Sequence, residues 1–289
     1  MSPSRLMQQL RWWSFPILLL GGCRSPVPRE VFPVSPAPPS PETPALRTAW
    51  SFRPSGVRLT YRLENHAQVT IRDDTSLRVD SVSSAAEAAF VSAGDGGRVS
   101  GQVLVYLVRV GDTPAAVPSG LALPLPFIAT SSAREQAYRF LTPAAPPCSA
   151  IASGIAQSLR DLWFRGPDTL RIGTTWRDSV GYGNCRDGVP FTMTITRSFR
   201  VSEVDRHGGR EQLTVVRTAV VSLHGEGAQS REAVLLKGTG ESELTYSLDA
   251  DTGEIVRADG TLVLDLTLLS KVRTQVVRQS GAVHVSRSP

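Results

Sequence analysis

Residues 191–223 read FTMTITRSFRVSEVDRHGGREQLTVVRTAVVSL, and this stretch decides the fold class. Apolar and polar side chains alternate on both sides of a turn signal, His207-Gly208-Gly209, and Arg197 interrupts the first run. The alternating apolar positions are Phe191, Met193, Ile195, Phe199 and Val201 before the turn, and Leu213, Val215, Ala219, Val221 and Leu223 after it. A period of two is typical of a β-strand with one buried face. Two such runs joined by glycine-rich residues predict a β-hairpin.

The same period continues on both sides of this hairpin. It begins near Val57, returns at Val103, Val105 and Leu107, and returns again over residues 262–268. Long antiparallel strands joined by tight turns favour a twisted sheet that curls. Gly238 and Gly240, inside a strand pattern, indicate a kink or bulge that adds curvature. We therefore predict an all-β fold, mainly antiparallel, with long strands in a strongly curved sheet or open barrel.

One amphipathic helix is predicted near residues 150–164. Its apolar stripe consists of Ile151, Ile155, Leu159, Leu162 and Trp163, spaced as one face of an α-helix. A glycine and a proline at 166 and 167 then end the pattern. Because the rest of the chain is β, we expect the stripe to be buried on the concave face or at the open end of the sheet.

The bulk composition is that of an ordinary globular protein. The chain has 289 residues, of which 41% are apolar and 20% charged, which is enough for a substantial core. The formal net charge of +5 is scattered, without a block of basic residues. Proteins that bind nucleic acid usually carry a basic stripe or patch. We therefore expect residues 50–289 to form a single β-rich globular domain without a nucleic-acid partner.

The N-terminus has the features of an export signal. Arg5 and Arg11 are followed by a short apolar run, which leads into Leu20-Gly21-Gly22-Cys23. A basic start, an apolar centre and small residues at the cut are typical of a secretory signal peptide. The run is too short to cross a bilayer as a helix, which takes about 20 residues. Residues 1–22 are therefore predicted to be a signal peptide.

Leu20-Gly21-Gly22-Cys23 resembles the lipobox of bacterial lipoproteins. The resemblance implies cleavage before Cys23, a diacylglycerol on its sulfur, and often a further acyl chain such as palmitate on the new amino group. Two or three acyl chains anchor a protein stably, whereas one is marginal. Arg24 stands where an aspartate would resemble an inner-membrane retention signal, which favours the outer membrane, facing the periplasm. The alternative is an ordinary signal peptide with an unrelated cysteine.

The segment after Cys23 is predicted to be a tether. Residues 24–49 contain eight prolines, which cannot donate backbone hydrogen bonds to a helix or sheet. Such a segment favours extended polyproline conformations. Residues 23–49 are therefore expected to be a lipidated cysteine and a disordered, proline-rich spacer.

Two further cysteines, Cys148 and Cys185, remain once Cys23 is assigned to the anchor. An exported protein meets an oxidising compartment, where a disulfide is the default for such a pair. The bond would connect the start of the helix to a later strand. The alternative is a pair of buried or reactive thiols.

No motif in the chain carries recognisable chemistry. The four histidines lie far apart, and the common hydrolase, zinc and phosphate-loop signatures are absent. Residues 249–253, Asp-Ala-Asp-Thr-Gly, resemble the start of a calcium loop, but the ligand expected at its twelfth position is replaced by Gly260. The same residues suit an ordinary turn between strands. We expect a protein without catalytic activity, metal or cofactor.

An apolar stretch, LALPLPFI over residues 121–128, contains two prolines that bar it from a central strand and predict a loop. Such a loop can act as a lid, touch a membrane or contact a partner; it can also fold back on the core. We take the apolar residues of this loop and of the helix as candidate lid or ligand contacts: Leu121, Leu123, Leu125, Phe127, Ile151, Ile155, Leu159 and Trp163.

A curved sheet with an amphipathic helix over its mouth resembles the periplasmic lipoprotein carriers that have an incomplete barrel and a helical lid. This resemblance implies binding of a lipid or another apolar ligand. Residues 172–176, Ile-Gly-Thr-Thr-Trp, are similar to a strand in uncharacterised β-rich bacterial lipoproteins, which brings no activity. A second hypothesis is a structural or assembly lipoprotein that presents a surface to an envelope protein. We predict a non-enzymatic lipoprotein and favour ligand binding.

Overall fold

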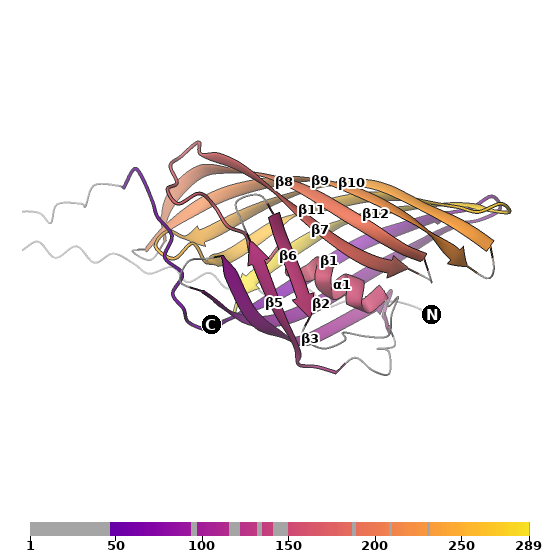
Figure 1. Cartoon of the computed structure of the whole chain (residues 1–289), viewed down its shortest axis with the longest axis horizontal. Coiled ribbons are helices and arrows are strands. Elements are labelled where there is room, and N and C mark those ends of the chain that lie inside the picture. Colours follow the sequence, from indigo (N-terminus) through magenta and orange to yellow (C-terminus); the bar gives the residue numbers. More distant parts are fainter. Residues whose placement is uncertain are drawn as a thin grey trace, which may run out of the picture. The chain divides into compact units, whose positions relative to one another are not determined.

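The computed structural model describes residues 47–93, 97–115, 122–131, 135–140, 150–186, 189–207, 210–229 and 232–288, which all belong to one compact unit, Leu46–Pro289. This unit is almost entirely β-sheet (Figure 1). Its elements in chain order are β1 (Leu59–Arg72), β2 (Leu77–Ser92), β3 (Arg98–Val110), β4 (Thr113–Pro114), β5 (Leu125–Ser131), β6 (Glu135–Phe140), α1 (Ala150–Leu159), β7 (Thr175–Arg186), β8 (Val189–His207), β9 (Arg210–Gln229), β10 (Glu232–Asp249), β11 (Ile255–Leu269) and β12 (Thr274–Arg287).

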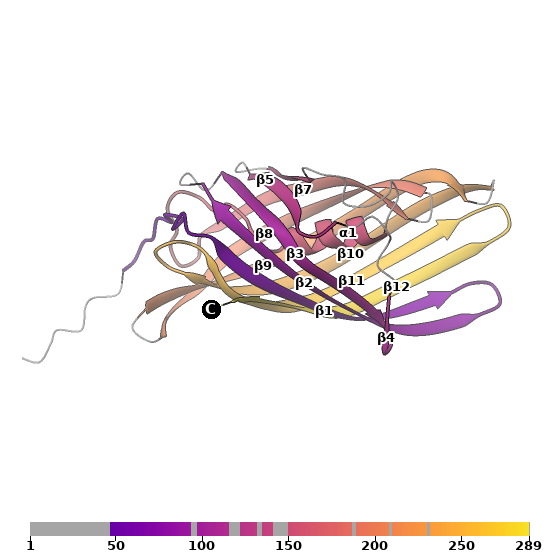
Figure 2. The ribbon, with the colours of Figure 1, turned by 90° about the horizontal axis from the view of Figure 1, so that it is seen from below.

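The described strands form one strongly curved sheet. Their order is β2-β1-β12-β11-β10-β9-β8-β7-β6-β5-β3-β4, and β2 also pairs with β3. The longest strands, β8, β9 and β10, have 19, 20 and 18 residues. Strands of this length accumulate a large twist, which curls the sheet around a concave face (Figure 2). The prediction of a curved, mainly antiparallel all-β fold is confirmed.

The sheet is not fully closed, because it is barely joined between β6 and β7. This parallel contact consists of two residue pairs among the described residues, Glu135↔Ser179 and Gln136↔Val180. Parallel strands need a long crossover connection, usually a helix. The connection between β6 and β7 is the part of the chain that contains α1, which explains why a single helix interrupts an otherwise β sequence.

The hairpin predicted from residues 191–223 is present as β8 and β9. Arg197 pairs with Ala219, and Ile195 pairs with Val221. The inward-facing residues of this hairpin and its neighbours form two apolar clusters. The first contains α1 residues together with Tyr61 and Tyr246. The second, on the other half of the long strands, includes Val221 and Leu236.

The inner face of β3 differs from the prediction. The alternation suggested that Val103, Val105 and Leu107 share a buried face, but Val105 and Leu107 are exposed whereas Val103 and Tyr106 are buried. The cause is an irregularity in the β2–β3 ladder, where Glu87 pairs with Val105 and the next residue pairs with Val103. One extra residue in a strand reverses which positions point inward.

The apolar stretch 121–128 is also not all loop. Leu125–Ser131 forms β5, which pairs with β3 on one side and β6 on the other. Pro126 is tolerated because it is the second residue of the strand and lies before the first pair with β6, Phe127↔Phe140. The prolines therefore mark the start of a strand.

The glycines of β10 do not produce the bulge that we expected. The β10–β11 ladder runs without a break through Gly238 and Gly240, and its irregularity lies further on, between Ser247 and Leu248. A Cβ atom at Gly238 would lie 2.4 Å from a methyl carbon of Leu266. The missing side chain therefore makes room for a leucine of the neighbouring strand.

Candidate functional site

The predicted ligand-contact residues mostly lie in the core. Leu125 and Phe127 of β5, Ile155 and Leu159 of α1, and Trp163 just after the helix are all buried in the first cluster. Leu123 is 36% exposed, just before β5.

No side-chain contacts are described for the other predicted site residues. Ile151 and Cys185 lie in α1 and β7, whereas Cys23, Leu121 and Cys148 lie outside the described residues. The Cys148–Cys185 disulfide and the lipid on Cys23 therefore remain predictions.

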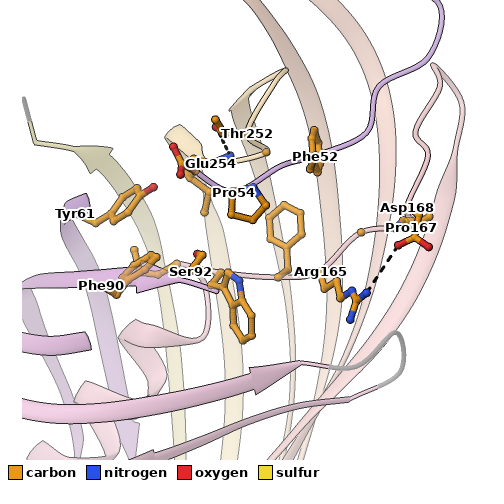
Figure 3. Close-up of a pocket in the computed structure, with 16 residues that line it drawn as sticks. Phe52, Pro54, Tyr61, Phe90, Ser92, Arg165, Pro167, Asp168, Thr252 and Glu254 are labelled. Atoms are coloured by element: carbon orange, nitrogen blue, oxygen red, sulfur yellow. Dashed lines mark hydrogen bonds and ion pairs between the residues drawn. The ribbon is translucent and has the colours of Figure 1, made fainter. Parts of the chain in front are cut away.

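A pocket opens where the chain enters the fold, and we call it the mouth pocket (Figure 3). Its walls come from the entering segment (residues 47–55, here the strap), from residues 162–168 after the helix, and from the turn at residues 252–255. Phe52, Pro54 and Trp163 contribute apolar surface, and Tyr61 stacks on Phe90 with ring centroids 5.0 Å apart. The pocket therefore suits an apolar or aromatic group.

The strap is fastened to this end of the sheet. Trp50 exchanges two backbone hydrogen bonds with Leu170, at 2.9 and 2.8 Å. Arg47 forms ion pairs with Glu211 and Asp251, each at 2.7 Å. Nearby, the Ser55 amide donates a 3.0 Å hydrogen bond to the carboxylate of Glu254. Residues 52 and 54 thus line the pocket from fixed positions.

The mouth pocket also has polar groups in its lining. Burial raises the pKa of the Tyr61 hydroxyl, and the nearby Glu254 carboxylate adds to this effect, whereas Arg287 opposes it. The Tyr61 hydroxyl therefore remains protonated and can donate a hydrogen bond. Arg165 and Asp168 face each other across 3.8 Å on the opposite wall.

A second cavity is lined by the helix itself, and we call it the helix cavity. It lies between α1 and strands β1, β2, β3, β11 and β12. Leu63, Tyr106 and Val283 supply apolar wall, and Arg160 and Asp161 lie at the end of the helix. A Cβ atom at Gly154 would stand 2.0 Å from the Tyr106 hydroxyl oxygen, so only glycine lets α1 approach this closely.

The two cavities are small. The mouth pocket has a volume of about 90 Å³ and the helix cavity about 170 Å³. Sites for drug-sized ligands usually measure about 300–1,000 Å³. Each cavity therefore admits a headgroup or a short apolar segment. A longer ligand requires residues 150–168, which contribute to the walls of both cavities, to move.

Charged side chains are buried in the concave face, between the two apolar clusters. Arg197 donates a 2.7 Å hydrogen bond from Nε to Asp178, and a second from Nη2 to the same carboxylate. Its Nη1 donates to the backbone oxygen of Arg160 at 2.8 Å. Both partners of this bidentate pair are almost fully buried. The pair holds the end of the helical segment against β7 and β8.

A second set of contacts extends this network to β9 and β10. Arg217 donates from Nη2 to Asp161 at 2.9 Å and from Nη1 to the Ser242 hydroxyl at 2.7 Å. Arg160 donates from Nε to the other oxygen of Asp161 at 3.2 Å. We call these residues, with Asp178 and Arg197, the buried ion network.

Attraction to the arginines keeps Asp161 charged. Burial acts to raise the pKa of Asp161, but attraction to Arg217, Arg160 and Arg197 outweighs it, so the pKa lies below its ordinary value. Asp161 is therefore ionised at neutral pH. The network thus brings the side chains of three arginines and two aspartates together in the concave face.

Sequence reasoning missed this network, although two signals were present. Arg197 and Arg217 each occupy an inward position in the alternation of their strand, where an apolar residue is expected. Arg160 and Asp161 directly follow the helix stripe. A single charge of this kind is easily attributed to a local irregularity. Only the register of β8 and β9 places the two arginines close together, where Arg197 meets Asp178 and Arg217 meets Asp161.

The remaining sequence signals have structural roles. Asp249 accepts hydrogen bonds from the amides of Asp251 and Thr252, both at 3.0 Å, as in an ordinary turn. Within the described ranges, no group of three or more His, Cys, Asp or Glu side chains is placed to hold a metal ion. Across the same ranges, no helix has the length and apolar character needed to cross a membrane.

Comparisons with known proteins assign no family to this chain. No protein-family model and no curated protein matches this chain. Among solved structures, a DUF1329 family protein from Desulfovibrio piger is similar at 10% sequence identity, over 76% of this chain and 84% of that chain, with a TM-score of 0.16.

Proposed function

We propose that this protein is an exported lipoprotein, anchored to the bacterial envelope through Cys23, that binds an apolar ligand within its curved sheet and catalyses no reaction. The observation that carries the ligand proposal is a pair of cavities lined by consecutive parts of one segment, which consists of the helix and the residues after it, 150–168. This segment buries its apolar stripe in the concave face, which is the surface an apolar ligand would occupy.

The helical segment, residues 150–168, is suited to move away from the sheet, because its helix has little stability of its own. α1 has ten residues, and an isolated helix of this length is marginal in water. Gly154 in its middle costs about 1 kcal/mol relative to alanine. The helix is therefore stabilised mainly by packing against the sheet. A ligand that offers equivalent apolar contacts can take its place and join the two cavities.

The anchor is tested by Cys23→Ala. We expect the wild-type protein to fractionate with membranes and to incorporate an alkyne-tagged fatty acid in growing cells, because a lipidated cysteine carries acyl chains. The variant is expected to lose the label completely, whereas Ser25→Ala, two residues further on, should keep it. Equal labelling of the wild-type protein and the Cys23→Ala variant would refute the anchor.

Ligand binding is tested by a native mass spectrum of the mature chain, residues 24–289, exported behind a signal peptide without a lipobox. This chain retains every element that the structure describes. We expect a reproducible adduct that extracts as lipid. Ser92→Phe, at the mouth pocket, should lower its occupancy several-fold by filling space, whereas Ser222→Phe, on the exposed face of β9, should not.

The same spectrum decides against ligand binding if the mass is that of the bare chain and added lipids are not taken up. In that case the apolar clusters are solid core, and an assembly role with a protein partner becomes the better proposal. Leu125 and Phe127 would not serve as its contact surface, because both are buried.

A further inference from the structure

We propose that the ligand is an amphiphile with a neutral headgroup of neighbouring hydroxyls, a glycerol or a sugar, and that the helix cavity holds this headgroup. The proposal rests on the proposed function and names the class of ligand. It is drawn from the neutral polar side chains that line the cavity, from the hydrogen bonds that they leave unmade, and from the pairing of the charged groups in the same wall.

The polar side chains of the helix cavity come from five elements. They are Asn65 of β1, Ser84 of β2, Tyr106 of β3, Gln157 of α1 and Gln279 of β12. Amide and hydroxyl side chains carry no charge, and each can both donate and accept hydrogen bonds. A ligand hydroxyl has the same double capacity. The set therefore matches a headgroup that carries several hydroxyls close together.

Most of this capacity is not used inside the protein. Among the described residues, the amides of Gln157 and Gln279 and the hydroxyl of Tyr106 have no hydrogen-bond partner. Asn65 donates a 3.2 Å hydrogen bond to the hydroxyl of Ser84, whose own proton can still be donated. Ligand hydroxyls would satisfy these groups, whereas a bare hydrocarbon would leave them unpaired, which is costly.

Tyr106 is the most deeply buried of the three unpaired groups, with 6% of its surface exposed. Its hydroxyl lies against the helix at Gly154. Unlike the hydroxyl of Tyr246, it is not fully enclosed by protein, so a ligand in the cavity can reach it. Burial raises the pKa of Tyr106 to about 12, so the hydroxyl stays protonated and can donate. Few buried polar groups lack a partner, which indicates a polar occupant for this cavity.

The charged groups in the same wall favour a neutral headgroup, because they are already paired. Arg160 and Asp161 form an ion pair at 3.2 Å, and a second arginine holds Asp161 at 2.9 Å. The remaining histidine of the lining, His66, is exposed to solvent. A charged headgroup would therefore lose its hydration without meeting an unpaired opposite charge. Apolar wall residues, Leu63 and Val283, suit the first methylene groups of the ligand chain.

The test is equilibrium dialysis of the mature chain with radiolabelled compounds of equal chain length, below their critical micelle concentrations. Monooctanoylglycerol and octyl glucoside carry neighbouring hydroxyls, methyl octanoate carries none, and octanoate is charged. We expect at least one hydroxylated compound to bind about tenfold or more tightly than methyl octanoate and octanoate, the factor that about two neutral hydrogen bonds give. The compound with the larger preference identifies a glycerol or a sugar headgroup.

Variants of the polar lining separate binding from folding. Tyr106→Phe removes only a hydroxyl that has no partner among the described residues, so stability should stay close to wild type while the preference falls about threefold or more. Gln157→Leu and Gln279→Leu should also lower the preference without weakening the binding of methyl octanoate. Gln68→Leu, at an exposed position of β1, is the matched control and should retain it.

The outcomes distinguish the two proposals. If lipid adducts form in the native mass spectrum but the hydroxylated compounds show no preference here, the neutral headgroup is refuted and the apolar-ligand proposal stands. If no lipid and no compound binds, the proposed function fails and this inference fails with it. Glycerol or glucose that binds as tightly as its octyl compound would indicate a free-polyol site and overturn the amphiphile. A preference that survives in all three lining variants would place the headgroup outside the helix cavity.

Discussion

Replacing Asp178 by alanine is expected to lower the free energy of unfolding by about 3–5 kcal/mol, because it leaves a buried guanidinium without its carboxylate. Asp178 is 4% exposed and accepts two hydrogen bonds from Arg197, which is 1% exposed. Urea unfolding followed by circular dichroism measures the change.

The matched control is Asp168→Ala, which removes a carboxylate whose side chain is 97% exposed and lies 3.8 Å from Arg165. An exposed pair of this kind contributes about 0–1 kcal/mol, so the control should stay close to wild type. The double variant Asp178→Ala/Arg197→Met should recover much of the loss, because a well-packed apolar pair can replace a buried ion pair. Equal stability of the Asp178→Ala variant and the control would show that the pair is not effectively buried.

Trp163→Ala is expected to lower the free energy of unfolding by a similar amount, about 3–5 kcal/mol, by removing a large core side chain and leaving a cavity. Trp163 is 9% exposed, belongs to the first apolar cluster and lines the mouth pocket. Its loss would also enlarge that pocket. We therefore expect the variant, measured below its own melting temperature, to take up longer apolar ligands than the wild-type protein.

Val272→Ala serves as the control for Trp163→Ala. Val272 is 71% exposed between β11 and β12, so its truncation should change stability by no more than about 0.5 kcal/mol. The prediction is contradicted by a Trp163→Ala protein as stable as this control. Unchanged ligand uptake at reduced stability would mean that the mouth pocket is not the point of entry for an apolar ligand.

The elements of this fold were predictable because each depends on a local pattern. The alternation over residues 191–223 required strands with one buried face, and the glycines at 208 and 209 marked the turn between them. The stripe containing Ile155 and Leu159 required a helix, and burial of that stripe in the concave face followed from the lack of another apolar partner. Neighbours in the chain contain the whole signal in these cases.

Features that depend on distant residues were not predictable in this way. One extra residue opposite Glu87 and Ala88 turned Val105 outward, and the first β6 pair, at Phe127, lay just far enough along β5 to tolerate Pro126. Neither the extra residue in β3 nor the position of the first β5–β6 pair changes the pattern of apolar residues in its own strand. The result depends on which strand lies alongside and in which register.

The candidate site likewise has some parts that depend on adjacent residues and others that depend on residues far apart in the chain. The predictions of a lipid anchor at Cys23 and of a tether rest on the sequence alone, since both patterns consist of adjacent residues and need no fold around them. The buried ion network required tertiary structure, because Arg160, Asp178, Arg197 and Arg217 come from four separate parts of the chain. In the sequence, a single inward arginine is only an exception to the alternation. The folded sheet buries this arginine against an aspartate of another element, and the buried ion pair can be identified only there.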